Sequence, residues 1–129
     1  MRGFNFPVVS VFAFLMALNT LEAQKIKVTL FNSSEKTINE IYLSQTEEEW
    51  GTNLISKNKL NFEEEKEVTI KSSGKQLWNL MVVDNDGNSS TITDLELFNK
   101  CVVEIFYSEG SYEIYIYDPS EEQTDETVD

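Results

Sequence analysis

The sequence predicts an all-β fold: a single antiparallel β-sandwich of about seven strands, Ig-like or similar, behind an N-terminal signal peptide. Three observations favour it. Apolar and polar residues alternate along most of the chain after Gln24, which is the period of half-buried strands. Turn-forming residues interrupt this alternation about every ten residues, as between short antiparallel strands. No stretch keeps the period of an amphipathic helix. A small barrel is the alternative architecture.

The first 23 residues have the layout of a secretory signal peptide. Arg2 supplies a positive charge, Val8–Leu18 is an apolar run, and Ala23 is the small residue before the predicted cleavage site. The run is well short of the ~20 residues that span a bilayer. We therefore expect export, to a periplasm or the outside, and no membrane span after cleavage. The mature chain then begins at Gln24.

The first two strands follow from alternation. Lys25–Asn32 is the first, and its apolar residues Ile26, Val28 and Leu30 alternate with polar ones. One face of this strand is therefore predicted to be buried and the other wet. Asparagine and serine residues then form a turn, and Thr37–Ser44 is the second predicted strand.

The longest irregular segment, Gln45–Asn58, separates the second and third strands. Thr46 is a candidate N-cap for a single helical turn within it. A third strand is predicted near Glu67–Ser72, where the alternation points Val68 and Ile70 toward the core.

The fourth predicted strand, Gln76–Asp84, is the most apolar. Its inward residues Trp78, Leu80 and Val82 favour a central position in a sheet. An Asp-Gly pair then supplies the positive φ that a tight hairpin needs. The chain returns as a fifth strand, Ser89–Leu97.

The last two strands are predicted at Cys101–Tyr107 and Ser111–Asp118. The single cysteine is expected to be a buried thiol or to form an intermolecular disulfide, because an internal disulfide needs two cysteines. The β-sandwich domain therefore covers residues 24–118. Residues 119–129 begin with a proline and are mostly polar and acidic, so they are predicted to be a disordered tail.

Charge limits the partners. The chain has 23 acidic side chains against 10 basic ones, a formal net charge of −13. Nucleic acids and anionic lipid surfaces are bound through lysine and arginine. The composition therefore excludes nucleic acid as a partner and leaves an unknown protein or carbohydrate.

Catalysis is restricted by the absence of histidine, the usual general base and the commonest metal ligand. A carboxylate-only hydrolase, such as a glycosidase, remains formally open. The acids are so numerous that no pair stands out, and we therefore expect no enzymatic activity.

The Asp84–Asn88 stretch, "DNDGN", has two interpretations. Asp84, Asp86 and Asn88 place oxygen ligands on alternate residues, as calcium sites do. Asp94 or the acids Glu47–Glu49 are candidates to complete such a site. As a hairpin turn, the stretch needs no ion, and the plain turn is favoured.

Three aromatic residues are candidate ligand-binding residues. Tyr115 and Tyr117 are predicted on the outward face of the last strand, with Tyr107 nearby in sequence, as a platform for a sugar or a peptide. The alternative is cross-strand packing on a half-covered face. Trp50, in "EEEWGTNLI", either pins its loop to the core or stacks on a ligand, and we favour the pin.

Several of these segments together resemble small exported, uncharacterised bacterial β-sandwich domains. The resemblance rests on the turn Asn32–Ser34, on the Trp-Gly-x-Asp/Asn-Leu motif at Trp50–Leu54, and on the strand end Val82–Gly87. It extends over about Ile26–Val103. Asn53 stands where this pattern more often has aspartate, which argues against a cation ligand there. The resemblance implies a fold and an exported location but no established activity.

The sequence thus predicts an exported, non-catalytic β-sandwich that binds or interacts with an unidentified partner. The loop Glu47–Leu54 and the Asp84–Asn88 turn are predicted to form the binding end of the sandwich. The alternative is a structural or adhesive surface component that assembles through the edge strand Ser111–Asp118.

Overall fold

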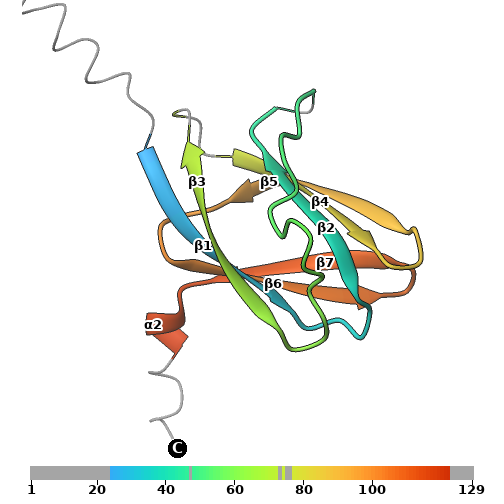
Figure 1. Cartoon of the computed structure of the whole chain (residues 1–129). Coiled ribbons are helices and arrows are strands. Elements are labelled where there is room, and N and C mark those ends of the chain that lie inside the picture. Colours follow the sequence, from blue (N-terminus) through green and yellow to red (C-terminus); the bar gives the residue numbers. More distant parts are fainter. Residues whose placement is uncertain (1–23, 47, 73, 75–76, 123–129) are drawn as a thin grey trace, which may run out of the picture.

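The structure, a computed structural model, describes residues 24–46, 48–72, 74 and 77–122. The predicted signal peptide and residues 123–129 of the predicted tail lie outside the described residues. The described residues form seven strands and one helical turn, shown in Figure 1. These are β1 (Gln24–Asn32), β2 (Ile38–Ser44), β3 (Glu65–Ser72), β4 (Leu77–Asp84), β5 (Ser89–Glu96), β6 (Cys101–Ser108), β7 (Ser111–Tyr117) and α2 (Pro119–Glu122).

The strands form two sheets, which confirms the all-β sandwich. Sheet A has the order β3-β1-β6-β7, and sheet B has the order β2-β4-β5. The two sheets cross over one another in Figure 1. The predicted positions of two strands are also confirmed, since β4 is central in sheet B and β7 is at an edge of sheet A.

One strand pair departs from the predicted antiparallel arrangement: β1 pairs with β6 in parallel. Parallel neighbours need a long crossover connection, and here the whole of sheet B and β3 lie between the two strands in sequence. Strand β1 is therefore central, between β3 and β6. In immunoglobulin constant domains the first strand is at a sheet edge, so this strand order differs from theirs.

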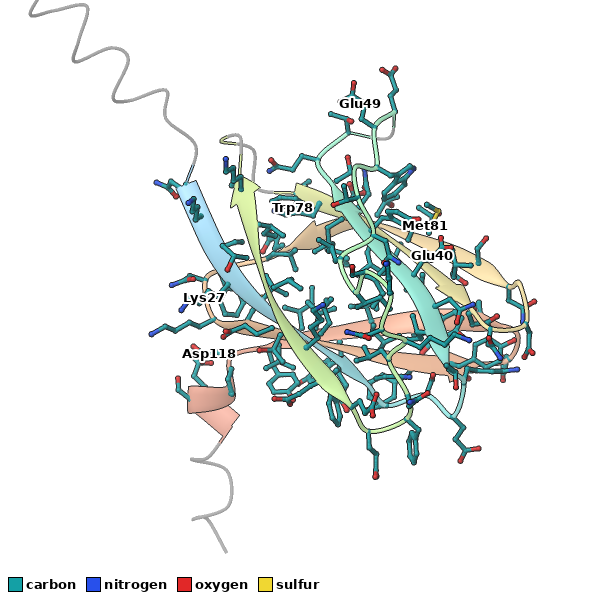
Figure 2. The ribbon with its side chains drawn as sticks, viewed as in Figure 1. Lys27, Glu40, Glu49, Trp78, Met81 and Asp118 are labelled. Carbon is teal, nitrogen blue, oxygen red and sulfur yellow. The ribbon has the colours of Figure 1, made fainter. Side chains whose placement is uncertain are left out.

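The core lies between the sheets and is made by the inward faces of both. Figure 2 shows the apolar side chains there, while charged side chains such as Lys27 and Glu49 project outward. The predicted inward residues of the first, third and fourth strands are buried, apart from Ile26, which is partly covered. The buried apolar residues are Val28, Leu30, Ile38, Ile41, Ile55, Leu60, Val68, Ile70, Trp78, Leu80, Val82, Cys101, Val103, Ile105 and Tyr112.

The long β2–β3 loop is attached to the core through Asn53 and Ile55. The Asn53 amide accepts from the Ile41 and Ile55 N–H groups at 3.0 and 3.2 Å, and its Nδ2 donates to the backbone carbonyl of Ser56 at 2.9 Å. Ile55 is fully buried. Trp50, which the sequence favoured as the pin, is only half-buried. The predicted helical turn at Thr46 does not form in the described part of this loop.

The two residues differ in their expected contribution to stability. Ile55→Ala is expected to lower the free energy of unfolding by about 3 kcal/mol, because it leaves a cavity in the core. Trp50→Ala is expected to cost about 1 kcal/mol, as for a partly exposed side chain. Urea denaturation of both variants checks this, and a larger loss for Trp50→Ala would restore Trp50 as the anchor.

The C-terminal part differs from its prediction at one place. Pro119–Glu122, predicted to begin the disordered tail, forms the helical turn α2. Its first residues are held by Asp118, whose Oδ1 accepts from the backbone N–H of Ser120 at 3.0 Å and from its hydroxyl at 2.8 Å. This is the capping contact that favours a helical start. Cys101 is a buried free thiol, and burial raises its pKa.

Candidate functional site

The carboxylate of Asp84 is buried and surrounded by donors from its own domain. Its Oδ1 accepts from the backbone N–H groups of Asp86 and Asn88, each at 2.9 Å. Its Oδ2 accepts from the Tyr112 hydroxyl at 2.7 Å and from Asn88 Nδ2 at 3.3 Å. Because Tyr112 is on β7 and Asp84 ends β4, this hydrogen bond joins the two sheets.

These contacts set the charge state of the pair. Burial by itself would raise the pKa of Asp84, but the hydrogen bonds from Tyr112, Asn88 and the Asp86 N–H outweigh it and lower the pKa. Burial and the neighbouring Asp84 carboxylate raise the pKa of Tyr112. A lowered carboxyl pKa is the opposite of what a general acid requires. Asp84 is therefore an ionised structural acceptor.

The strand pairing in sheet B separates the residues that the calcium hypothesis placed in one site. Ile38 pairs with Asp84 and Ser44 pairs with Asn79, so the loop after Ser44 lies at the opposite end of sheet B from the Asp84 turn. Asp94, on β5 next to the partner of Trp78, also lies at that far end. The predicted joint binding end of Glu47–Leu54 and Asp84–Asn88 is therefore wrong.

Neither Asp94 nor Glu48 and Glu49, the described acids of that stretch, lie at the end of sheet B where they could complete a cation site at Asp84. Among the described residues, no group of three or more histidine, cysteine, aspartate or glutamate side chains has a geometry suited to a metal ion. The internal hydrogen bonds of Asp84 favour the plain turn. Calcium binding by Asp84, Asp86 and Asn88 stays a prediction.

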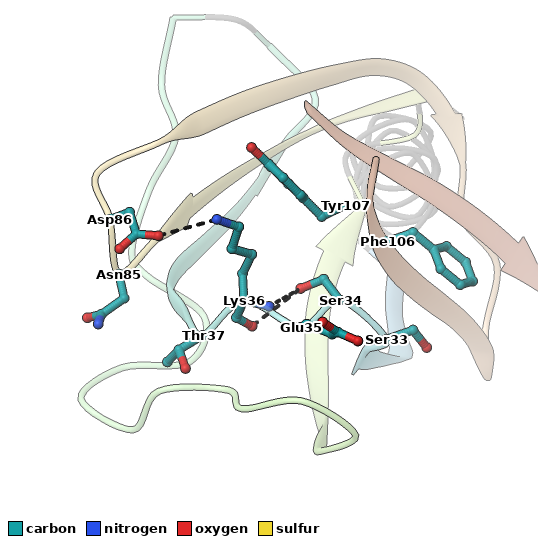
Figure 3. A pocket seen from close by; sticks show the side chains of 9 residues that line it. All are labelled: Ser33, Ser34, Glu35, Lys36, Thr37, Asn85, Asp86, Phe106 and Tyr107. Carbon is teal, nitrogen blue, oxygen red and sulfur yellow. Dashed lines mark hydrogen bonds and ion pairs between the residues drawn. The ribbon is translucent and has the colours of Figure 1, made fainter. Parts of the chain in front are cut away.

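An open hollow of about 670 Å³ lies beside this turn. Figure 3 shows its lining: the β1–β2 turn (residues 33–37), Asn85 and Asp86 of the β4–β5 turn, and Phe106 and Tyr107 of β6. Lys36 Nζ lies 3.4 Å from Asp86 Oδ2 and 4.8 Å from the centre of the Tyr107 ring. These contacts tie the two turns together and to β6. The lysine ammonium that a ligand would meet is thus already paired within the protein.

Asn32 organises the β1–β2 turn, and the sequence did not single it out for this role. It is fully buried. Its Nδ2 donates to the backbone carbonyls of Lys36 at 2.8 Å and Leu60 at 2.9 Å, while its Oδ1 accepts from the Ser34 N–H and hydroxyl. The available signal was its position as the last inward residue of an alternating strand, because a polar residue there must find buried partners.

Tyr115 and Tyr117 point outward from sheet A, as predicted. Their ring centres lie 5.3 Å apart with the ring planes inclined at 33°, and Tyr115 is 55% exposed. Tyr107 is not part of this pair. Its ring packs edge-on against Tyr112, with the centres 4.8 Å apart, on the opposite face of the sheet. Tyr115 and Tyr117 therefore form an aromatic pair without Tyr107, and within this pair Tyr115 is exposed and Tyr117 is partly buried.

Phe106 belongs to the same outer face, although the sequence did not predict it as a site residue. It is 38% exposed and pairs across the ladder with Glu113, while Tyr115 pairs with Glu104. Strict alternation along the sixth strand places Phe106 outward, opposite to Tyr107. We call this surface the β6–β7 outer face; it comprises Glu104, Phe106, Glu113, Tyr115 and Tyr117.

Comparisons with known proteins bear on the fold alone. No protein-family model matches the sequence, and no curated protein is similar to it. A solved structure described as "NMR structure of the protein from Eubacterium rectale" is similar in fold, with 15% sequence identity and a TM-score of 0.55. The match covers 73% of this chain and 89% of that one. In the described part of this chain, no helix has the length and apolarity to cross a membrane.

Proposed function

We propose that this protein is an exported, non-catalytic interaction module whose binding surface is the β6–β7 outer face. The observation that carries the proposal is the adjacent pair of the exposed Tyr115 and the partly buried Tyr117 on a regular strand at the edge of sheet A. The bound partner is another protein.

The chemistry of this surface supports a protein partner. Tyrosine offers a large, rigid apolar ring with a polar tip, and tyrosines are enriched among residues that dominate interface energies. Phe106 extends the apolar area across β6. The exposed carboxylate of Glu113, beside it on β7, supplies a polar rim of the kind that surrounds interface centres.

Other parts of the proposal come from the sequence. The apolar segment Val8–Leu18 supports export, and the absence of histidine supports a role without catalysis. Membership of the small exported bacterial β-sandwich domains that the Trp50–Leu54 motif resembles is part of the same proposal. A structural role in assembly through β7 is the alternative use of this surface.

A carbohydrate partner is the second candidate, and the tilted tyrosine pair favours it. A sugar ring has an apolar face that packs on an aromatic ring, and Glu113 is placed to accept hydrogen bonds from sugar hydroxyls. In this candidate the sugar is bound by side chains of the β6–β7 outer face alone, without backbone groups.

Both candidates are tested by NMR titration of the ¹⁵N-labelled chain Gln24–Asp129. The probes are an acetylated decapeptide of alternating lysine and valine and a neutral β-linked glucose hexasaccharide. We expect the peptide to shift the amide signals of residues 113–117. The double variant Tyr115→Ala, Tyr117→Ala should bind the peptide about ten-fold more weakly.

The matched control is Tyr42→Ala, since Tyr42 lies on β2 in the other sheet and its hydroxyl bonds to Glu40. It should leave the affinity unchanged. Shifts caused by the hexasaccharide alone would favour the carbohydrate candidate. If neither probe shifts residues 113–117, this surface is not a binding site.

A further inference from the structure

Three of the four edges of the described sheets carry features that disfavour pairing with another strand. The outer edge of β2 is covered by its own loop. Leu60 exchanges two backbone hydrogen bonds with Ile38 at 2.9 and 3.0 Å, and the Leu54 N–H donates to the Ile41 carbonyl at 2.8 Å. A covered edge has no backbone groups to offer a partner.

The edges at β5 and β3 are protected differently. The β4–β5 register shifts between Trp78 and Leu80, and Asp94, opposite this shift, has φ of 63°. A bulge of this kind twists an edge away from a flat partner. Strand β3, "EKEVTIKS", carries two glutamates and two lysines, and charges along an edge strand discourage pairing.

Beyond Tyr112, whose N–H donates to Ser90 Oγ of β5, the edge at β7 has none of these features. Its sequence, "SYEIYIY", contains one charged residue and no proline. It pairs with β6 from Ser108–Ser111 to Val102–Tyr117 without a register shift. In the part of the chain that the structure describes, β6 is its only hydrogen-bonded strand neighbour. A regular aromatic and β-branched edge is a template for strand addition.

The hairpin geometry shows which backbone groups face this edge. Glu109 and Gly110 have φ of 54° and 91°, and two positive φ values are those of a type I′ turn. The flanking pair Ser108–Ser111 is then hydrogen-bonded, and alternate residues of β7 point their N–H and C=O groups away from β6. Tyr112 confirms this phase, because its N–H donates outward to Ser90 Oγ at 3.2 Å.

By the same alternation, the backbone groups of Ile114 and Ile116 face the open part of the edge. The outward side chains beside them are Glu113, Tyr115 and Tyr117. An added strand would therefore meet the outward-pointing N–H and C=O groups of Ile114 and Ile116. Beside them it would meet two aromatic rings and a carboxylate.

We propose that β7 binds an extended, lysine- or arginine-bearing segment of a partner protein by strand addition between Glu113 and Tyr117. This inference rests on the proposed function and deepens it by naming the partner's chemistry and binding mode. Main-chain hydrogen bonds to Ile114 and Ile116 supply affinity, and alternate side chains on the tyrosine face supply specificity.

Charge selects the partner. The chain carries a formal net charge of −13, so a second copy is repelled while a basic segment is attracted. A cationic side chain opposite Glu113 makes a favourable cross-strand pair, and one near Tyr115 or Tyr117 can lie over an aromatic ring. A basic extended segment therefore fits this edge better than another copy of this chain.

The test compares Ile116→Pro with Ile116→Ala in the chain Gln24–Asp129. Both variants lose the same partly buried side chain, but only proline removes the outward N–H, and an edge strand tolerates proline where its N–H faces solvent. The probe is the acetylated lysine–valine decapeptide, with a glutamate–valine decapeptide as the charge control. The ¹⁵N spectra of both variants verify the fold.

We expect the lysine–valine peptide to protect the Ile114 and Ile116 amides from hydrogen exchange. Ile116→Pro should weaken binding about five-fold more than Ile116→Ala, which is the effect of one hydrogen bond. The glutamate–valine peptide should bind much more weakly, and added salt should reduce the difference between the two peptides.

Equal binding by the two variants would overturn strand addition and leave side-chain docking on the tyrosines, so the proposed function would stand. Protection of the same amides by raising the protein concentration without peptide would identify a second copy as the occupant and overturn the basic partner. Failure of both the peptide and the hexasaccharide to shift residues 113–117 would overturn this inference together with the proposed function.

Discussion

Asn32→Asp is expected to destabilise the fold by about 3–4 kcal/mol. The buried Nδ2 of Asn32 donates at 2.8 and 2.9 Å to the carbonyls of Lys36 and Leu60. A carboxylate has no donor, and its second oxygen would face these two carbonyl oxygens without solvent to screen them. The loss combines two broken hydrogen bonds with the burial of an unpaired charge.

Urea denaturation of the two proteins measures this difference. Asn58→Asp is the matched control, because Asn58 is exposed in the β2–β3 loop, and it should change the free energy of unfolding by less than about 0.5 kcal/mol. Asn32→Asp variants should also show the largest NMR changes in residues 33–37 and near Leu60. A loss no greater than that of the control would show that the amide contacts of Asn32 contribute little.

Asp84→Asn is expected to cost about 2 kcal/mol at neutral pH. Both carboxylate oxygens of Asp84 act as acceptors, from two N–H groups on one side and from Tyr112 and Asn88 on the other. In the Asn side chain one of these two oxygens is replaced by an NH₂ group, which is a donor. That group would face N–H or O–H donors that need an acceptor. At least one buried hydrogen bond is then lost, and the link between β4 and β7 weakens.

The same substitution should alter how the free energy of unfolding changes at acidic pH. The folded-state pKa of Asp84 lies below its ordinary value, so the unfolded chain binds its proton first as the pH falls. The stabilisation is complete above the unfolded pKa of about 4 and is lost as the pH falls through the lower folded pKa. Asp84→Asn should therefore flatten the decline in the free energy of unfolding below about pH 5.

Asp86→Asn provides the control for this pH dependence. The Asp86 side chain is 63% exposed and pairs with Lys36 at 3.4 Å, so its loss should cost about 0.5 kcal/mol or less. Equilibrium unfolding between about pH 2 and 7 compares the three proteins. A decline in Asp84→Asn as steep as in the unchanged protein would assign acid sensitivity to other carboxylates.

Alternation along the chain was enough to locate the strands and the core. Each of the seven predicted strands exists, with ends within two residues of those observed. The inward assignment of residues such as Val28, Val68 and Leu80 is confirmed. Successive side chains of any strand point to opposite faces of the sheet, whatever its neighbours are. A strand with one face on the core therefore shows the alternation in its own sequence.

The site was predicted in part. The outward direction of Tyr115 and Tyr117 followed from the same alternation, but their surroundings did not. Phe106 completes the outer face because β6 is the strand beside β7. Tyr107, close in sequence, lies on the other face. Which residues share a face across two strands depends on register, and no local pattern encodes it.

By itself, the sequence determined the fold class, the strand positions, the inward and outward faces, and the acidic net charge. Only the tertiary structure decided that β1 lies between β3 and β6, that the Trp50 loop and the Asp84 turn lie at opposite ends of sheet B, and that β7 lies at an edge of sheet A. Those features depend on pairing between segments distant in sequence. Side-chain periodicity specifies what each strand buries, whereas the choice of neighbour is made by the packing of all the strands together.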